Sequence, residues 1–237
     1  MIYAEILAGG KGTRMGNTDM PKQFLMLGTK PIIIHTIEQF LISSKFSKII
    51  VCCPKDWITY MNDLLEKYLP NHDIDVVVGG KTRNETIMNG CKFIEENYGL
   101  NDDDIIVTHD AVRPFITQRI IKDNIEAISD DVYAVDTVIP AVDTIVESND
   151  GKQITSIPNR AYMYQGQTPQ SFNIKKLMEV YETLSSEEKE ILTDACKIFS
   201  IKKKKVNIVE GETYNIKITN INDLKIANAI LMERGNK

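Results

Sequence analysis

Residues 7–16, Leu-Ala-Gly-Gly-Lys-Gly-Thr-Arg-Met-Gly, form the segment of this chain best suited to bind an anion. Glycines at positions 9, 10 and 12 let the backbone turn tightly and bring its N–H groups against an anion without a Cβ atom in the way. Arg14 can bind phosphate through two parallel hydrogen bonds, and Lys11 adds charge nearby. Lys22, between Pro21 and Gln23, is a further cation. The pattern predicts a phosphate-binding loop.

The sequence of this loop differs from two common phosphate-binding motifs. A P-loop requires Lys and then Ser or Thr directly after its last glycine, whereas Gly12 is followed by Thr13 and Arg14. The dinucleotide fingerprint Gly-x-Gly-x-x-Gly fails because Met15 stands at the third glycine position. This mismatch counts against an oxidoreductase on a Rossmann domain. For a lone glycine cluster, a Gly-rich turn with ordinary surface charges is the simpler interpretation.

Asp110 is the second candidate for chemistry, in the run His109-Asp110-Ala111-Val112-Arg113-Pro114 that follows an apolar segment. A carboxylate at the carboxyl end of a parallel strand can hold Mg²⁺ on a triphosphate. Arg113 can brace the loop or contact phosphate. Taken alone, an Asp in this position is more often a cap or turn residue, and His109, without partners, is more simply structural.

Hydrogen-bonding residues gather around one cation, Arg160, in the C-terminal half of the chain. They lie in segments 159–160, 165–170 and 193–195. Such a set suits a phosphorylated polyol. Lys217 stands in the otherwise apolar segment 214–219, where spacing alone would have it face solvent.

Apolar runs alternate with helical periodicities in the first half of the chain. Strands are expected at 2–7, 48–52, 74–78 and 104–108, and helices at 31–43, 54–68, 82–97 and 118–128. Thr82 with Glu85 fits a capping box. This alternation predicts a parallel sheet covered by helices on both faces, with ligands beyond the carboxyl ends of its strands. Loops 8–17, 79–86 and 109–113 are expected to meet there.

The pattern changes after Ala134. Strands are expected at 134–140, 143–147, 206–209 and 215–218, and helices at 174–184, 186–199 and 221–234. Asp150-Gly151 is a strong hairpin signal, so residues 141–158 are expected to form a projecting β-arm. The four lysines at 202–205 are interpreted as a solvated turn.

Composition narrows the class of protein. The chain has 237 residues, 43% of them hydrophobic, which is enough for one sizeable domain. A net charge of −5 speaks against a nucleic-acid coat or a membrane-surface protein. No apolar stretch approaches the ~20 residues of a spanning helix, and the N-terminus lacks the pattern of a signal peptide. Cys52, Cys53, Cys91 and Cys196 are expected to be reduced thiols of a cytoplasmic protein, and adjacent Cys52 and Cys53 make a poor metal pair.

Seven motifs in a fixed order give the chain a resemblance to a known family. They are Ala8-Gly9-Gly10-x-Gly12-x-Arg14-Met15, Pro21-Lys22-Gln23, Gly79-Gly80-x-x-Arg83, His109-Asp110-Ala111-x-Arg113-Pro114, Gln167-Thr168-Pro169-Gln170, Thr193-Asp194 and Asn215-Ile216-Lys217. Over essentially its full length the chain resembles the cytidylyltransferases that include 2-C-methyl-D-erythritol 4-phosphate cytidylyltransferase and ribitol-5-phosphate cytidylyltransferase. The resemblance implies a Rossmann-like, mostly parallel, twisted α/β sheet of the nucleotide-diphospho-sugar transferase type, in one domain over residues 1–237.

The resemblance also implies a role for each motif. Arg14, Lys22 and Lys217 are implied to be the catalytic cations. The implied nucleotide site comprises Leu7, Ala8, Gly9, Gly10, Gly12, Gly80, Lys81, Arg83, Thr86, Asp110 and Ala111. Asp110 is the implied ligand of Mg²⁺ or another divalent cation. The implied acceptor site comprises Arg113, Asp143, Thr144, Arg160, Thr168 and Thr193, with the arm contributed across a homodimer.

Within the family, the wording of segments 107–115, 164–170 and 194–197 is similar to the ribitol-phosphate branch. Lys81 and Ala195 stand where the methylerythritol branch usually has acidic residues. The implied reaction joins CMP from CTP to D-ribitol 5-phosphate, giving CDP-ribitol and pyrophosphate for teichoic acid or capsule synthesis. A ribulose-5-phosphate reductase of the same pathway is an implied partner, whereas nucleic acid and membrane insertion are not expected.

Two rival functions remain at this point. One is the methylerythritol enzyme of isoprenoid precursor synthesis, which performs the same chemistry on another acceptor. The other is a non-catalytic nucleotide-binding protein that has kept the fold. Such a protein would be expected to lack Arg14, Lys22 or Asp110, and all three are present.

Overall fold

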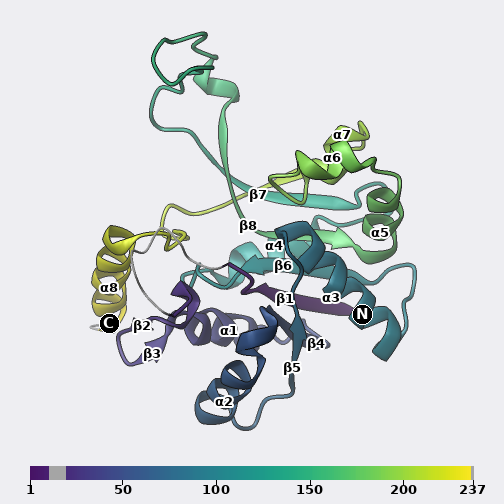
Figure 1. Ribbon diagram of the computed structural model, residues 1–237, viewed down its shortest axis with the longest axis vertical. Coiled ribbons are helices and arrows are strands. Elements are labelled where there is room, and N and C mark those ends of the chain that lie inside the picture. Colours follow the sequence, from purple (N-terminus) through teal and green to yellow (C-terminus); the bar gives the residue numbers. More distant parts are fainter. Residues whose placement is uncertain (11–19, 236–237) are drawn as a thin grey trace.

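The computed structural model of the protein describes residues 1–10 and 20–235, and its centre is a seven-stranded sheet (Figure 1). The strand order is β5-β4-β1-β6-β8-β7-β9. Four neighbours are parallel: β5 (Ile74–Val78), β4 (Lys48–Cys53), β1 (Ile2–Leu7) and β6 (Ile105–Asp110). β8 (Tyr164–Asn173) runs antiparallel to β6 and to β7 (Ala134–Pro140), and β9 (Asn207–Glu210) is parallel to β7. The expected, mostly parallel α/β sheet is confirmed.

Helices cover both faces of this sheet, as the alternating sequence pattern predicts. One face packs on α1 (Ile32–Ile42), α2 (Ile58–Tyr68) and α4 (Gln118–Glu126). The other packs on α3 (Arg83–Tyr98), α5 (Ile174–Glu182) and α7 (Lys197–Ile201). The remaining elements are the short strands β2 (Met26–Leu27) and β3 (Lys30–Pro31), the helices α6 (Ser186–Glu190) and α8 (Ile221–Gly235), and the 3-10 turns η2 (Lys22–Phe24), η3 (Lys55–Trp57) and η4 (Arg160–Tyr162).

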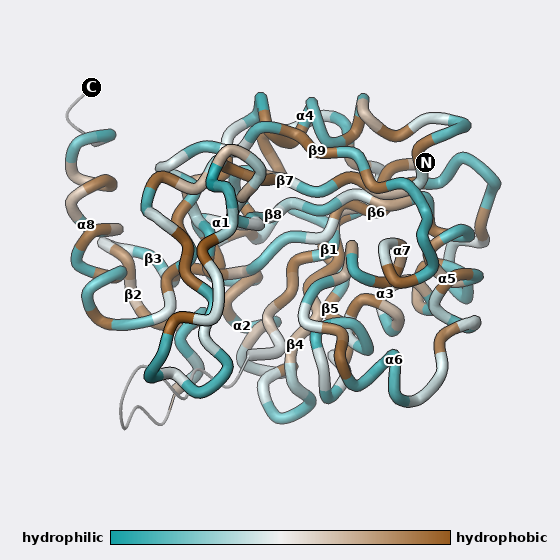
Figure 2. Tube along the Cα trace, turned by 90° about the horizontal axis from the view of Figure 1, so that it is seen from above, coloured by the Kyte–Doolittle hydropathy of each residue, from teal (hydrophilic) through white to brown (hydrophobic). Residues whose placement is uncertain are grey.

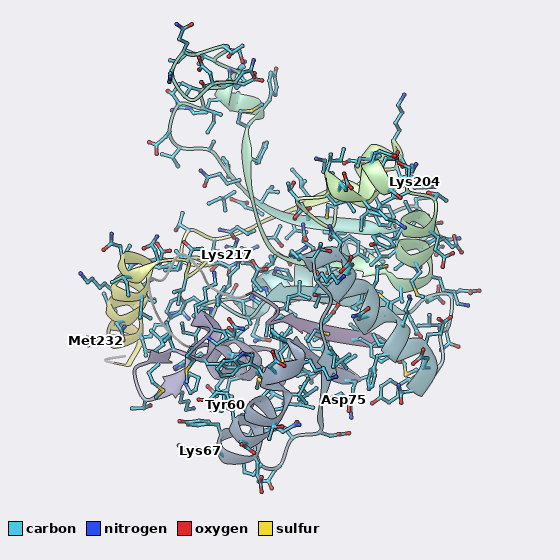
Figure 3. The ribbon with its side chains drawn as sticks, viewed as in Figure 1. Tyr60, Lys67, Asp75, Lys204, Lys217 and Met232 are labelled. Carbon is cyan, nitrogen blue, oxygen red and sulfur yellow. The ribbon has the colours of Figure 1, made fainter. Side chains whose placement is uncertain are left out.

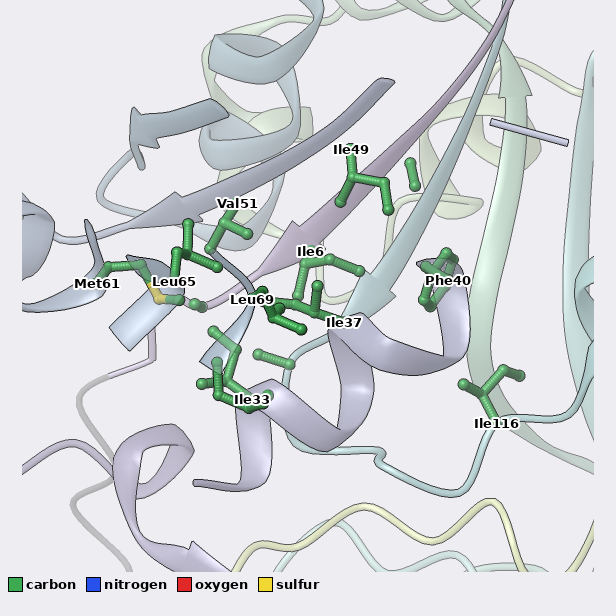
Figure 4. Packing of buried hydrophobic residues seen from close by; sticks show 14 of the residues in the cluster. Ile6, Ile33, Ile37, Phe40, Ile49, Val51, Met61, Leu65, Leu69 and Ile116 are labelled. Atoms are coloured by element: carbon green, nitrogen blue, oxygen red, sulfur yellow. The ribbon is translucent and has the colours of Figure 1, made fainter. Parts of the chain in front are cut away.

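Two hydrophobic clusters follow from the alternation of side chains along the strands. Ile6 of β1 packs with Ile37 of α1 in the first cluster (Figure 4), whereas Tyr3 of β1 belongs to the cluster on the opposite face. Adjacent Cys52 and Cys53 likewise belong to different clusters, as the strand geometry predicts. All four cysteines are buried and free. Among the described residues, no helix has both the length and the apolar character needed to cross a membrane.

The structure contains one long strand that sequence patterning misses. β8 reads Tyr-Gln-Gly-Gln-Thr-Pro-Gln-Ser-Phe-Asn and is hydrophilic along most of its length (Figure 2), yet its last seven residues are buried. A polar run with a proline at position 169 is atypical of a central strand. It is accommodated because its side chains find buried partners: Ser171 bonds to Asn124, and Gln167 bonds to the backbone of Glu212.

Three expected elements are wrong. Residues 143–147 form no strand, because the two sides of residues 141–163, hereafter the arm, meet only at a bridge between Glu147 and Ser156 and at a bond from the N–H of Ala141 to the carbonyl of Met163. The arm projects away from the sheet (Figure 1). The helix expected at 186–199 is broken into α6 and α7, since Asp194 in the gap accepts the N–H of Cys196. Residues 215–218 form no strand, although Ile218 donates its N–H to Val112.

Several local predictions are confirmed at the level of single residues. β1, β5 and β7 have the expected bounds. The capping box of Thr82 and Glu85 is present at the start of α3. Because this box fixes the first turn of the helix, it also fixes the direction in which Arg83 leaves the backbone.

Glu5, in the middle of β1, is a fully buried carboxyl group. Its Oε1 accepts a hydrogen bond from the Cys52 thiol at 3.1 Å, while its Oε2 is buried without a hydrogen-bond partner among the described residues. Burial raises the pKa of Glu5 to about 8, and the Cys52 bond and the Arg83 charge offset this only in part. At neutral pH the folded protein therefore holds a proton that the unfolded chain has already released.

We expect Glu5→Gln to stabilise the protein increasingly as the pH rises. With a raised pKa in the fold, the contribution of Glu5 to stability is fully present below its ordinary value of 4.5 and is lost as the pH rises to about 8. The substitution should therefore gain less than about 1 kcal/mol near pH 5 and more than about 2 kcal/mol near pH 8. Urea unfolding at both pH values measures this, with exposed Glu96→Gln as control. A gain that does not depend on pH would refute the assignment.

Candidate active site

A cleft of about 880 Å³ lies at the carboxyl ends of the parallel strands. The described parts of the three loops expected to meet do meet here. Residues 7–10 begin at the last residue of β1, residues 78–86 at the last residue of β5, and residues 110–112 at the last residue of β6. Twelve of the residues proposed from sequence line it: Leu7, Ala8, Gly9, Gly10, Lys22, Gly80, Lys81, Arg83, Thr86, Asp110, Ala111 and Lys217. Gly12 and Arg14 lie outside the described residues.

The first loop is anchored at its base. Ala8 donates its N–H to Cys52 of the neighbouring strand β4, and its carbonyl accepts from Nε2 of buried Gln23 at 2.6 Å. Gln23 follows Lys22 in η2, so the same turn that braces the loop brings Lys22 to the cleft wall. Sequence reasoning placed Gln23 in a motif without giving it this structural role.

The loop before α3 is shaped by one glycine and one hydroxyl group. A Cβ atom at Gly80 would lie 2.3 Å from Cβ of Glu85, so no other residue fits without moving the helix start. The N–H of Gly80 donates to Oγ1 of Thr86 at 3.0 Å, and the N–H of Lys81 donates to Glu85 at 2.7 Å. These bonds hold the loop open toward the cleft.

Asp110, the last residue of β6, is surrounded by three cations. Its Oδ1 lies 3.7 Å from Nε of Arg83, and its Oδ2 lies 3.2 Å from Nε of Arg113 and 3.0 Å from Nζ of Lys217. Burial opposes ionisation, but the charges of Arg83, Lys217 and Arg113 outweigh it and hold the pKa of Asp110 well below its usual range. The carboxylate is therefore ionised at neutral pH.

Lys217 reaches this carboxylate from the segment that leads to α8 (Figure 3). The expected strand around it is absent, but Ile218 is fully buried and its N–H bonds to Val112, and these contacts fix the segment beside the cleft. Lys217 is exposed, as its spacing suggests, but it also takes part in the site. Its ammonium group lines the cleft and its side chain is 40% exposed.

His109 is structural, as its isolation in the sequence suggests. Its Nε2 lies 3.1 Å from the carbonyl oxygen of Arg113, and its Nδ1 lies 3.0 Å from Oγ1 of Thr168. Burial lowers the pKa of His109 to about 4, so the ring is neutral at physiological pH. The hydroxyl of Thr168 also accepts the N–H of Asp110 at 3.1 Å. Thr168 thus connects β8 to the acidic end of β6.

The residues proposed for the acceptor site are not all brought together. Arg113 is buried, and its Nη1 donates to the carbonyl of Asn215 at 2.8 Å, so it braces the loop. Thr193 is exposed in the gap between α6 and α7. Asp143, Thr144 and Arg160 are exposed on the arm, where Arg160 donates to the carbonyl of Val142. None of the three arm residues lines the cleft within the described part of this chain.

Asp110 fits the requirements of a magnesium ligand. Mg²⁺ sites that serve phosphoryl transfer commonly use one or two carboxylates together with oxygens of the bound phosphates. Asp110 is ionised, it lines the cleft, and the only described cation near its Oδ1 is Arg83, at 3.7 Å. That separation exceeds a hydrogen bond, so this oxygen retains a lone pair for a cation.

Comparisons with known proteins point to a single family. Residues 2–233 match the family model of 2-C-methyl-D-erythritol 4-phosphate cytidylyltransferase. The chain is 58% identical over 234 residues to the ribitol-5-phosphate cytidylyltransferase of Lactiplantibacillus plantarum, a match that covers 99% of this chain and 100% of that protein.

Solved structures agree with this match. The 4-diphosphocytidyl-2C-methyl-D-erythritol synthase of Anaerococcus prevotii is 30% identical, with a TM-score of 0.78 and coverage of 98% of each chain. The 2-C-methyl-D-erythritol 4-phosphate cytidylyltransferase of Francisella tularensis is 28% identical, with a TM-score of 0.79 and coverage of 96% of this chain and 98% of that one.

The geometry predicts different outcomes for the two cations that share Oδ2 of Asp110. Arg113→Met should destabilise the protein by about 1–3 kcal/mol, because it leaves buried acceptors on Asp110 and Asn215 without their donor. Lys217→Met should change stability by less than about 1 kcal/mol, because a half-exposed ion pair contributes little. Urea unfolding of both variants tests this, and equal losses would contradict it.

Proposed function

Because the chain belongs to the 2-C-methyl-D-erythritol 4-phosphate cytidylyltransferase family, we propose that it transfers CMP from CTP to D-ribitol 5-phosphate and releases pyrophosphate. The family makes the chain a cytidylyltransferase, which uses CTP and a phosphorylated sugar alcohol. The observation that carries the choice of acceptor is the full-length match, at 58% identity, to a ribitol-5-phosphate cytidylyltransferase. The product of this reaction is CDP-ribitol.

The chemistry is an in-line displacement at the α-phosphorus of CTP. An oxygen of the acceptor phosphate forms the new P–O bond, the bond to the β-phosphate breaks, and the electron pair leaves with pyrophosphate. A phosphate monoester is already anionic near neutral pH, so no strong general base is needed. Positioning and charge neutralisation carry the catalysis.

The cleft supplies cations for this purpose. We assign Lys22 and Arg14 to the triphosphate and Lys217 to the reacting phosphate, with the residues around Gly80 and Thr86 holding the cytidine. Lys22 and Lys217 both line the cleft, and Nζ of Lys217 lies 3.0 Å from Oδ2 of Asp110. The backbone N–H groups of residues 9 and 10 border the same space, where no Cβ atom shields them.

Asp110 is the residue that would hold Mg²⁺ or another divalent cation. When bound, such an ion neutralises charge on the triphosphate and helps to orient it. The other partners of Asp110 are cations of the protein itself, so the carboxylate also keeps Lys217 and Arg83 in place at the cleft.

We propose that the arm completes the acceptor site of a second copy in a homodimer. Exposed apolar side chains on the arm include Val142, Ile154 and Ile157, each at least 60% exposed, and such a surface is expected to pack on a partner. Arg160 and Thr144 lie on the same arm, away from the cleft of their own chain. Sedimentation of a monomer at micromolar concentration would count against this assembly.

We further propose a cytoplasmic enzyme that feeds teichoic acid or capsule synthesis. Its acceptor would come from reduction of a pentulose phosphate, so a ribulose-5-phosphate reductase is the expected neighbour in the pathway. Four buried free thiols are consistent with a reducing compartment.

D-ribitol 5-phosphate is expected to be the better acceptor by far. Compared with 2-C-methyl-D-erythritol 4-phosphate it has an additional carbon and hydroxyl group and lacks the methyl branch. A site built to bond a hydroxyl rejects an analogue without it by as much as ~10⁴–10⁵, whereas a methyl group alone gives about 10–200-fold. Pyrophosphate release at fixed CTP and Mg²⁺ gives kcat/KM for both acceptors. Equal values, or a preference for the methylerythritol compound, would overturn the proposal, as would equal rates with UTP.

Arg14→Met and Lys22→Met should each lower kcat/KM by the equivalent of about 2.7–4 kcal/mol, the range typical of preorganised donors to a developing anion. Thermal melts should remain close to wild type. Lys204→Met, at an exposed lysine remote from the cleft (Figure 3), is the matched control for loss of a positive charge. Near-normal turnover in either variant would remove that residue from the proposed site.

A further inference from the structure

A pair of carboxylates lies beyond Arg83, on the side of the sheet that carries α5 and α7. Asp136 comes from β7, and Asp194 comes from the gap between α6 and α7. Nε2 of Gln170 on β8 lies 2.8 Å from Oδ1 of Asp136, and 2.8 Å and 2.7 Å from the two carboxylate oxygens of Asp194. One amide group therefore holds both acids in place.

The strand register explains why these residues meet. Thr108 of β6 pairs with Gln170, and Gln170 pairs with Asp136, so the three stand side by side across adjacent strands. Their side chains share a face, because in-register neighbours in a sheet point the same way. Burial and the nearby Asp194 raise the pKa of Asp136 to about 6, and Gln170 and Arg83 offset part of this rise. Asp136 is therefore largely ionised near neutral pH, although burial and the neighbouring carboxylate oppose its charge.

Buried polar atoms beside this pair lack partners among the described residues. Gln170 is fully buried, and Oε1 of the amide that contacts both acids has no hydrogen bond. Nη1 and Nη2 of Arg83 are also buried without partners. Arg83 lines the cleft, its Nε faces Asp110, and its charge also lowers the pKa of Asp136. Unsatisfied donors and acceptors therefore lie beside both the cleft and the acid pair.

The mixture of groups indicates what this region would bind. Ligand atoms of Asp136, Asp194 and Cys196 lie within 4.8 Å of one another, as a metal site requires, but burial raises the pKa of the Cys196 thiol, and a protonated thiol is a poor ligand. A phosphate group would be repelled by the negative charge of the carboxylates. A hydroxyl group donates one hydrogen bond and accepts others, so it can satisfy a carboxylate and a guanidinium at once. Neutral groups that both donate and accept fit best.

We propose that Asp136 and Asp194, held by Gln170 and flanked by Arg83, bind hydroxyl groups of the acceptor's polyol chain and set the choice of acceptor. This inference rests on the proposed function, because it names the contacts of the chain that follows the reacting phosphate. Lys217 and Asp110 lie where we place the reacting phosphate of the acceptor. Arg83 lies near Asp110 and also near the acid pair. A longer polyol reaches the pair, and a shorter one does not.

The test compares acceptors of two lengths in Asp136→Asn, an isosteric change that keeps the shape of the side chain. For D-ribitol 5-phosphate, kcat/KM should fall about 10- to 100-fold, the range expected for losing a hydrogen bond to a charged group. For glycerol 3-phosphate, which is too short to reach the pair, the fall should be less than about 3-fold. A purely structural role of Asp136 would instead lower kcat/KM for both acceptors together. The KM for CTP and the melting temperature should stay close to wild type. Asp194→Asn should behave similarly, although its carboxylate also caps the N–H of Cys196.

Asp102→Asn, at an exposed carboxylate paired with Lys175 away from the cleft, is the control for loss of one negative charge. An unchanged preference between the two acceptors in Asp136→Asn would overturn the inference and leave the proposed function standing. A wild-type protein that turns over no polyol phosphate would overturn both. Metal analysis supplies a third criterion: a bound divalent cation that is lost in Asp136→Asn would identify the pair as a metal site and overturn the assignment to hydroxyl groups.

Discussion

The charge balance around Asp110 is the interaction on which the site depends. One buried carboxylate at the end of β6 holds Arg83 from α3, Arg113 from its own loop and Lys217 from the segment before α8. Three cations so close together would repel one another, and the carboxylate makes their proximity tolerable. Because they come from distant parts of the chain, this contact also connects the halves of the molecule. The proposed phosphate-binding surface and the fold therefore depend on the same buried carboxylate.

The second constraint is the polar strand β8. It passes between β6 and β7 and places Thr168 against His109 and the backbone of Asp110, and Gln170 against Asp136. Buried polar side chains are costly unless each finds a partner, so the strand requires the matching groups on its neighbours. Where the described part of the chain offers no partner, at Oε1 of Gln170 and the terminal nitrogens of Arg83, the unsatisfied atoms lie beside the proposed acceptor region. The fold thus accepts a local cost beside its site.

These two features explain how a transferase can work without a nucleophilic side chain. The acceptor phosphate is itself the nucleophile, so the protein needs to bring two anions together and neutralise the charge they share. Lys22, Lys217 and the glycine loop suit that task, and neutral His109 takes no part in it. We place the chemistry common to the family in the cleft. We assign discrimination between acceptors to Asp136 on β7 and Asp194, which Gln170 on β8 holds together.

The sequence by itself determined the parallel half of the sheet, the capping box of α3 and most of the cleft. These depend on local signals: apolar runs of strand length, a Thr82–Glu85 pair, and glycines beside cations. It did not predict β8, whose polar residues and proline hide a buried strand, nor the break between α6 and α7. It placed Lys217 on a strand that does not form. Only the tertiary structure decided these points and the meeting of Asp136 with Asp194, because each depends on partners distant in sequence whose hydrogen bonds and charges no local pattern encodes.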